Sequence, residues 1–414
     1  MRRAFETTAW LLLVGSIVLP TALAEIKAGL LLLATFLAIY LTVKEKPAIL
    51  PEFAFFWAIY PVAGIAWSVY GLAMGNPGAV RVLTVMLAYP LVFPLLATCY
   101  QPAYDRRIYS AMQAAAWILV ATNVVYLAGS LLSGGGAVVD AMQSLFGDNA
   151  VVDDGDDYFK FTLPNVPSLI FLIPFFLVAL LSGFAKSPVA GVALILSMLA
   201  VGVLSGRRAL LVTAALGPML AYALTCGAKR DEHRSSSGLV RNAGISAALI
   251  FTALWLFYGF DRSEFYRDQL ISVFDFSDNA SNTERRLQFE ALSAGWAESP
   301  IFGAGAGAAA GYSRSVEHPW AYELSYVAFL FQYGVVGFLL YSIGILYLVF
   351  RLRELVKGHG RDSIFYCVLA GFLSFLAANA TNPYLAKFDF MWVLFLPFAM
   401  VGSRRQEPKT GAQK

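Results

Sequence analysis

Long runs of apolar residues dominate the chain, with short polar connections between most of them. A helix that crosses a hydrocarbon core about 30 Å thick needs roughly 20 residues, which is close to the length of each run. The runs are continuously apolar and do not alternate, so they predict transmembrane helices and not the strands of a membrane barrel. We place the predicted spans at 7–24, 27–43, 53–73, 80–99, 108–132, 163–183, 188–204, 208–227, 242–260, 320–350, 364–382 and 386–402.

The composition narrows the class of protein. Of 414 residues, 58% are hydrophobic and 14% are charged, and the mean hydropathy is +0.65. These values exclude a soluble enzyme, a nucleic-acid-binding protein, a disordered scaffold and a disulfide-stapled secreted domain. We therefore predict an all-α integral membrane protein of about twelve transmembrane helices, in which residues 1–414 form a single polytopic domain.

The charges of the connections predict an orientation. With both termini in the cytoplasm, the cytoplasmic segments hold 19 of the 30 Lys and Arg residues but only 9 of the 27 Asp and Glu residues. Cytoplasmic connections of membrane proteins carry such an excess of basic residues. The two long connections, 133–162 and 261–319, then lie on the outer, periplasmic face of a bacterial inner membrane. Long loops in compact folds tend to be functional, so we look for the site there.

The second long loop contains a predicted helix. Residues 281–284, with the sequence Ser-Asn-Thr-Glu, fit a capping box, and 285–296 read as an amphipathic helix against the membrane surface. Arg285 and Arg286 lie in its first turn, where unpaired backbone N–H groups already favour anions. Successive helical residues point about 100° apart, so we expect only one of the two arginines to face the protein interior.

The same loop continues with a glycine-rich turn and a histidine. Gly303, Gly305 and Gly307 would allow close backbone approach to a ligand, or they make a flexible turn. His318 is the one histidine on the predicted outer face, and Glu317 beside it could orient its imidazole. Pro319 is expected to start the next span and to hold His318 just outside it.

A second pair of arginines lies in the short outer turn between two spans. Arg207 and Arg208 stand on the side that basic residues usually avoid, a placement that is costly unless an anion is met there. The arginines would pair with lipid head groups or recognise a phosphate, for which the guanidinium has the matching bidentate geometry.

These residue types suggest chemistry without a metal. The predicted outer face has one His and no Cys, and its acidic run at 153–157 lacks the ligand spacing of a calcium-binding loop. Arginines would have to stabilise a pyrophosphate in such a site. His is the simplest general base near neutral pH, because its unperturbed pKa is about 6.5.

The whole pattern resembles the O-antigen ligase and O-antigen polymerase superfamily. The resemblance covers most of the chain by topology, with an Arg at the outer end of span 8, and about 261–340 by motif. Pro319 stands where the family has Asn or Ser. The motif residues that carry it are an outer-loop Arg, Trp296, Pro300, Gly303, Gly305, Gly307, His318, Gly334 and Gly337.

The resemblance implies an O-antigen ligase, a glycosyltransferase of lipopolysaccharide biosynthesis. Its donor is O-polysaccharide on undecaprenyl pyrophosphate, its acceptor is a sugar hydroxyl of lipid A–core, and no cofactor is required. Arginines of the two pairs would bind the pyrophosphate, and His318 would act as general base in an inverting transfer. An O-antigen polymerase, a protein O-oligosaccharyltransferase and a flippase or transporter for lipid-linked saccharide remain the alternatives.

Overall fold

Helices make up most of the computed structural model. The structure describes residues 1–46, 51–133, 136–147, 150–155, 158–185, 187–226, 280–313 and 315–404. The predicted span 242–260 and the first part of the loop 261–319 lie outside these ranges.

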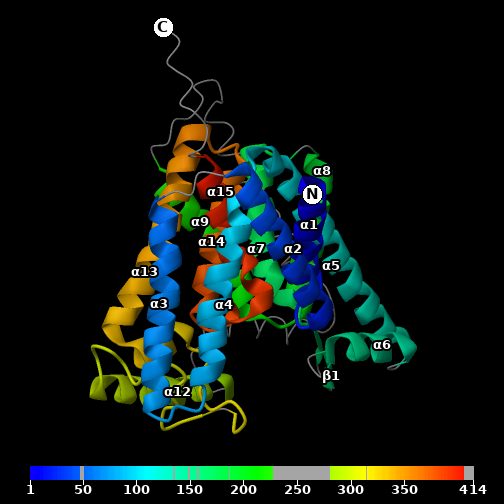
Figure 1. Cartoon of the computed structure of the whole chain (residues 1–414). Coiled ribbons are helices and arrows are strands. Elements are labelled where there is room, and N and C mark those ends of the chain that lie inside the picture. The colour runs from blue at the N-terminus through cyan, green and yellow to red at the C-terminus, as the bar shows by residue number, and fades with distance from the viewer. Residues whose placement is uncertain are drawn as a thin grey trace.

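The helices follow the predicted apolar runs along the chain (Figure 1). Their bounds are α1 Arg2–Val18, α2 Ala24–Glu45, α3 Pro51–Ala73, α4 Ala79–Thr98, α5 Asp105–Ser133, α6 Ala137–Phe146, α7 Leu169–Ser182, α8 Pro188–Leu204, α9 Arg208–Leu224, α12 Ala280–Glu298, α13 Ser325–His359, α14 Ile364–Asn379 and α15 Trp392–Arg404. Short 3₁₀ turns lie at η1 Pro102–Tyr104, η3 Val166–Ser168, η4 Tyr384–Ala386 and η5 Phe388–Phe390.

Four of the described helical stretches are long and apolar enough to cross a membrane: α2, α4, η1 with α5, and α13. Several other helices, among them α7, α8 and α14, are apolar but shorter. The chain therefore has the character of a helical membrane protein. The count of twelve spans stays a prediction.

The fold departs from an all-α protein at one place. In the first long loop, α6 is followed by a two-stranded antiparallel hairpin of β1 Val151–Gly155 and β2 Tyr158–Thr162, with Val151 opposite Thr162 and Gly155 opposite Tyr158. Two strands cannot form an independent sheet of any stability. The hairpin is thus an appendage of a helical fold.

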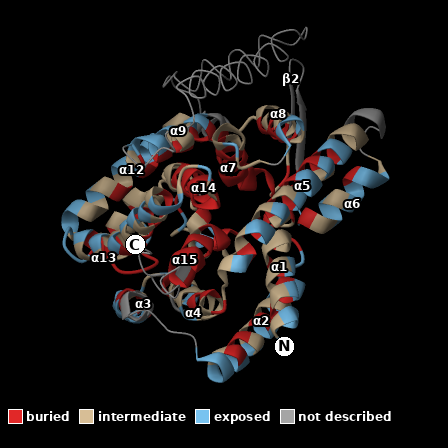
Figure 2. Cartoon of the chain, turned by 90° about the horizontal axis from the view of Figure 1, so that it is seen from above, coloured by how far each residue is buried: buried red, intermediate tan, exposed pale blue. Residues whose placement is uncertain are grey.

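Helices α7 and α14 form the centre of the bundle, with α9 and α15 beside them (Figure 2). Every residue of α14 from Ile364 to Phe375 is buried, which is expected of a helix that is apolar on all sides. The close approach depends on small residues: a side chain at Gly371 would meet the ring of Phe171 at 2.9 Å.

The polar connections separate into two ends of the bundle. Figure 1 shows the beginning of α1 and the end of α13 toward one end, and α6, β1 and α12 at the other. At the first end Arg2 pairs with Glu45, and Arg361 donates to the carbonyl of Thr225 at 2.8 Å. The connections predicted to be cytoplasmic and those predicted to be periplasmic thus lie at opposite ends.

Candidate functional site

The glycine-rich turn contacts the backbone of a kink in α13. Gly334 has φ +63° and interrupts the helix, so carbonyls and amides on both sides of it lack their usual partners within the helix. The amides of Ala304 and Gly305 donate to the carbonyls of Phe331 and Gln332 at 2.9 and 3.0 Å. A side chain at Gly303, which has φ +73°, would come within 2.5 Å of the Gly334 nitrogen. The backbone pairing therefore requires glycine on both sides.

The same turn also contacts the end of α3 and the beginning of α4. The Ala306 amide donates to the carbonyl of Trp67 at 3.1 Å, and the indole of Trp67 donates to the carbonyl of Phe302 at 2.8 Å. Asn76 donates to the carbonyl of Ala304 at 2.9 Å. We call residues 300–307 the glycine clamp. Its glycines allow backbone to approach backbone. The contacts of the clamp are therefore with other parts of the chain, whereas the sequence pattern predicts either close approach to a ligand or a flexible turn.

Helix α12 packs on the glycine clamp and on the start of α13. The predicted amphipathic helix is confirmed and is longer than expected, so Ser281 is its second residue and not a cap before it. Leu292 is fully buried in this contact, and Phe331 lies where a side chain at Gly295 would be. The apolar face of α12 thus meets protein and not the membrane surface, and Leu287 in the same helix is exposed.

The two arginines of α12 differ in environment, as the 100° spacing predicts. Arg285 Nε donates to Glu323 Oε2 at 3.0 Å, and the Glu323 backbone amide donates to the buried Gln288 at 2.9 Å. Arg286 is exposed and lies 4.0 Å from Glu290, one helical turn away. Arg285 is therefore the member of the pair that ties α12 to the segment before α13.

His318 and Glu317 lie on that segment with exposed side chains. The His318 amide donates to Ser315 Oγ at 3.2 Å, and its ring lies 5.4 Å from the ring of Trp320. The expectation that Pro319 starts the next helix is wrong, because α13 begins at Ser325. The five residues between Pro319 and α13 form turns that place Glu323 against α12.

Arg207 belongs to a different group of contacts. It directly precedes α9, and its Nη1 donates to the hydroxyl of Tyr384 at a long 3.5 Å. Its Nε is buried and has no hydrogen-bond partner among the described residues. Lys387 lies close by at the protein surface, and partial desolvation, followed by the charge of Arg207, lowers the pKa of Lys387, while Asp389 opposes that shift. The side chain of Arg208 lies outside the described part of the chain.

Asp389 is already paired. Lys27 and Asp389 form a buried ion pair, in which Lys27 also donates to the carbonyl of Leu19 and Asp389 accepts from the Thr21 amide. Sequence reasoning missed Lys27 and Lys387. The one available indication was that each is a lysine at the edge of a long apolar run, where a charge has few partners.

Both groups lie at the same end of the bundle, where α14 finishes. The hydroxyl of Tyr326, in the first turn of α13, donates to the carbonyl of Leu376 at 2.6 Å, and Asn379 accepts from the amide of Leu385, next to Tyr384. The hydrogen bonds of the described residues link Arg285 with Glu323 and Arg207 with Tyr384. They bring neither arginine to His318 directly.

Comparison with known proteins gives no relative from which a role could be transferred. The chain matches no protein-family model and no curated protein. Among the described side chains, no three of His, Cys, Asp and Glu come together in a group that could hold a metal ion.

Proposed function

We propose that this chain is a membrane-bound glycosyltransferase of the O-antigen ligase type, with its site at the end of the bundle where α14 finishes. It transfers O-polysaccharide from undecaprenyl pyrophosphate to a sugar hydroxyl of lipid A–core. In this proposal the chain lies in the bacterial inner membrane with both termini in the cytoplasm, and the site faces the periplasm.

The excess of positive charge around Arg207 carries the proposal. Arg207 and Lys387 are close enough for the charge of one to lower the pKa of the other, and the carboxylate that opposes this shift, Asp389, is already paired with Lys27. A buried guanidinium N–H without an acceptor costs free energy. A diphosphate would supply the missing acceptor and the missing negative charge, and Arg is well suited to bind it.

The exposure of His318 supports its proposed role as general base. Its imidazole is exposed, so an incoming acceptor alcohol can reach it. We assign Arg285 to holding its segment in place through Glu323, because that ion pair already neutralises the guanidinium. Glu317 is free to approach the imidazole from the neighbouring position in the chain.

The reaction that follows is a single inverting displacement. The acceptor oxygen attacks the anomeric carbon from the face opposite the leaving group, and its proton passes to His318. The bond between the anomeric carbon and the phosphate oxygen breaks with its electron pair, which undecaprenyl diphosphate keeps. Arg207 and Lys387 stabilise the charge that develops on that leaving group, and this kind of electrostatic term usually dominates catalysis.

The decisive experiment mixes purified full-length protein with undecaprenyl-pyrophosphate glycan and lipid A–core. We expect glycan on the core. Longer glycan on the carrier would indicate an O-antigen polymerase, and movement of the carrier across a vesicle membrane without covalent change would indicate a flippase. Either of these outcomes overturns the ligase assignment. Full activity in the presence of a chelator is the further expectation.

A further inference from the structure

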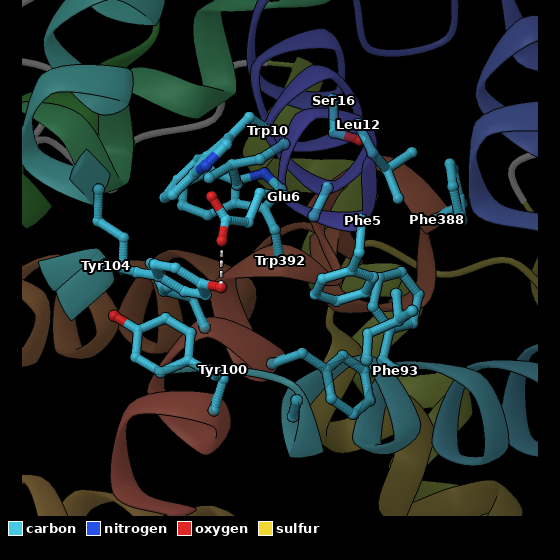
Figure 3. A pocket seen from close by; sticks show the side chains of 18 residues that line it. Phe5, Glu6, Trp10, Leu12, Ser16, Phe93, Tyr100, Tyr104, Phe388 and Trp392 are labelled. Carbon is cyan, nitrogen blue, oxygen red and sulfur yellow. Dashed lines mark hydrogen bonds between the residues drawn. The ribbon is translucent and has the colours of Figure 1, made fainter. Parts of the chain in front are cut away.

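An apolar cavity of about 150 Å³ lies between α1, α4 and α15. Aromatic side chains make most of its wall: Phe5 and Trp10 from α1, Phe93 from α4, and Trp392 from α15 (Figure 3). The candidate glycosyl-transfer site uses none of these residues. The cavity is therefore a separate feature with its own chemistry.

The length of the cavity fits the depth of one membrane leaflet. On α1 its lining runs from Phe5 to Ser16, which is about 16 Å along a helix. A hydrocarbon core about 30 Å thick gives each leaflet roughly 15 Å. The lining thus matches a single acyl chain in length and apolar character, and the volume of about 150 Å³ encloses part of such a chain.

A second, more open pocket adjoins the cavity at the end where α1 begins. Glu6 and Trp10 line both, and Figure 3 shows Glu6 hydrogen-bonded to Tyr104 at the wall of the cavity. The open pocket adds Arg106 and Arg107 from the first turn of α5. An apolar slot that ends at two guanidinium groups has the polarity of an amphiphile with an anionic head.

The charges of the open pocket leave one cation uncompensated. Glu6 accepts from the Tyr104 hydroxyl at 2.7 Å and from Arg107 at 2.6 Å, so its carboxylate is already satisfied. Arg106 is exposed and has no ion pair or side-chain hydrogen bond among the described residues. Ser110, one turn further along α5, adds a hydroxyl to the same pocket.

We propose that this cavity is a binding site for an anionic phospholipid, with one acyl chain between α1, α4 and α15 and the phosphate against Arg106 and Arg107. Basic pockets between membrane helices on the cytoplasmic side are known to bind anionic head groups, and this is the end that the charge distribution predicts to be cytoplasmic. Arg106 and Arg107 lie at the end of the bundle opposite Arg207, although the apolar lining extends to Phe388, next to Lys387. A donor whose pyrophosphate is bound at Arg207 could not also place that group against Arg106 and Arg107.

The test measures quenching of tryptophan fluorescence by brominated lipids in micelles of the full-length protein. Bromine on the acyl chain quenches by contact, and Trp10 and Trp392 line the cavity. We expect brominated phosphatidylglycerol to bind with saturation, at least fivefold more tightly than phosphatidylcholine with the same chains. Trp10→Phe should reduce the saturable quenching, whereas Trp117→Phe, at an exposed position on α5, should not.

Substitution of the free arginine separates a head-group site from general contact with lipid. Arg106→Gln should weaken phosphatidylglycerol binding roughly fivefold and leave phosphatidylcholine unaffected. Arg3→Gln is the matched control, because Arg3 is exposed at the same end and lines neither pocket. Equal affinity for both lipids, or equal effects of the two substitutions, would overturn the proposal. So would displacement of the lipid by inorganic phosphate at equal concentration, since the acyl chain would then add nothing.

Discussion

At the scale of single residues, Arg207 has surroundings that a bound anion would complete, because its buried Nε lacks an acceptor among the described residues. An unpaired buried donor costs about 1–3 kcal/mol, and more when it is charged. A nearby lysine adds repulsion, and Asp389 is held by Lys27. An anion bound there would supply an acceptor for the guanidinium and a compensating negative charge.

Arg207→Gln should therefore weaken engagement of the donor. Removing one partner of a close charge contact costs about 2–5 kcal/mol, so we expect kcat/KM for the lipid-linked donor to fall by a factor of roughly 30 or more. Arg81→Gln is the matched control, since Arg81 is exposed in the first turn of α4 and has no role in the proposal. Initial rates at varied donor concentration measure both. The diphosphate role of Arg207 is wrong if the two variants behave alike.

His318→Ala should abolish transfer and leave donor binding intact. A general base accelerates a reaction by a factor of about 10²–10⁴, so we expect kcat to fall by that factor. The His318 side chain is exposed, so the change in folding free energy should stay within about 0.5 kcal/mol. Single-turnover transfer and a donor-binding isotherm on the same preparation separate the two effects. Retained turnover would remove His318 from the mechanism.

At the scale of elements, the glycine clamp joins the consecutive helices α3 and α4 to α12 and α13, which come much later in the chain. Residues 300–307 pair with the kink of α13, with the end of α3 and with the beginning of α4, and α12 packs on them. The glycines with positive φ are needed because backbone meets backbone. Arg285 and Gln288 of α12 in turn bind Glu323, which lies five residues after His318.

Gly303→Ala should destabilise this clamp. A left-handed backbone costs a residue with a side chain about 1–2 kcal/mol, and the added methyl would also overlap the Gly334 backbone. We expect the free energy of unfolding in detergent to fall by about 2 kcal/mol or more. Gly311→Ala is the control in the same loop, because nothing lies within 4 Å of an added Cβ there. Equal stability of the two variants would show that the clamp contributes little.

The sequence predicts the helices well and the contacts between them poorly. The start of α14 at Ile364 was placed correctly, because an apolar helix begins where the polar connection ends. The start of α15 at Trp392 was placed six residues early, since the apolar run continues through the two 3₁₀ turns η4 and η5. Hydropathy measures apolar content, and it does not distinguish a helix from the buried turns that lead into it.

The candidate site was predicted in part for a related reason. The arginines could be predicted as site residues because basic residues are uncommon in short connections on the outer face. The partner that Arg285 meets, Glu323, lies 38 residues away, and the pairing of Lys27 with Asp389 spans 362 residues. No local pattern encodes such pairings. They follow from how the helices pack, which the residue types alone do not fix.

At the scale of the whole molecule, the ion pair of Lys27 and Asp389 fastens the first two helices to the last one. Lys27 lies in the first turn of α2, Asp389 in η5 before α15, and both side chains are buried. The Thr21 amide and the Leu19 carbonyl, in the turn between α1 and α2, complete the contact. Burial of such a pair constrains the arrangement of helices more than it adds stability.

Lys27→Met alone should destabilise the protein by about 3–5 kcal/mol, because it leaves Asp389 buried without a counter-charge. The double variant Lys27→Met, Asp389→Leu should recover most of that loss, since two apolar side chains of similar size replace the pair. Unfolding in detergent measures both. A double variant as unstable as the single one would mean that the pair itself, and not the unpaired carboxylate, sets the stability.

The predicted orientation of the whole molecule, with both termini in the cytoplasm, can be tested at two glycines that have open space around them. Gly311 lies in the loop between α12 and α13, Gly358 lies near the other end of α13, and an added Cβ meets nothing within 4 Å at either position. In a Cys226→Ser background, which removes the exposed native thiol, Gly311→Cys should react with a membrane-impermeant maleimide in cells whose outer membrane has been permeabilised. Gly358→Cys should react only after lysis, because the basic connections at its end favour the cytoplasm. The reverse pattern would place His318 and Arg207 in the cytoplasm, where a lipid-linked donor presented in the periplasm could not reach them.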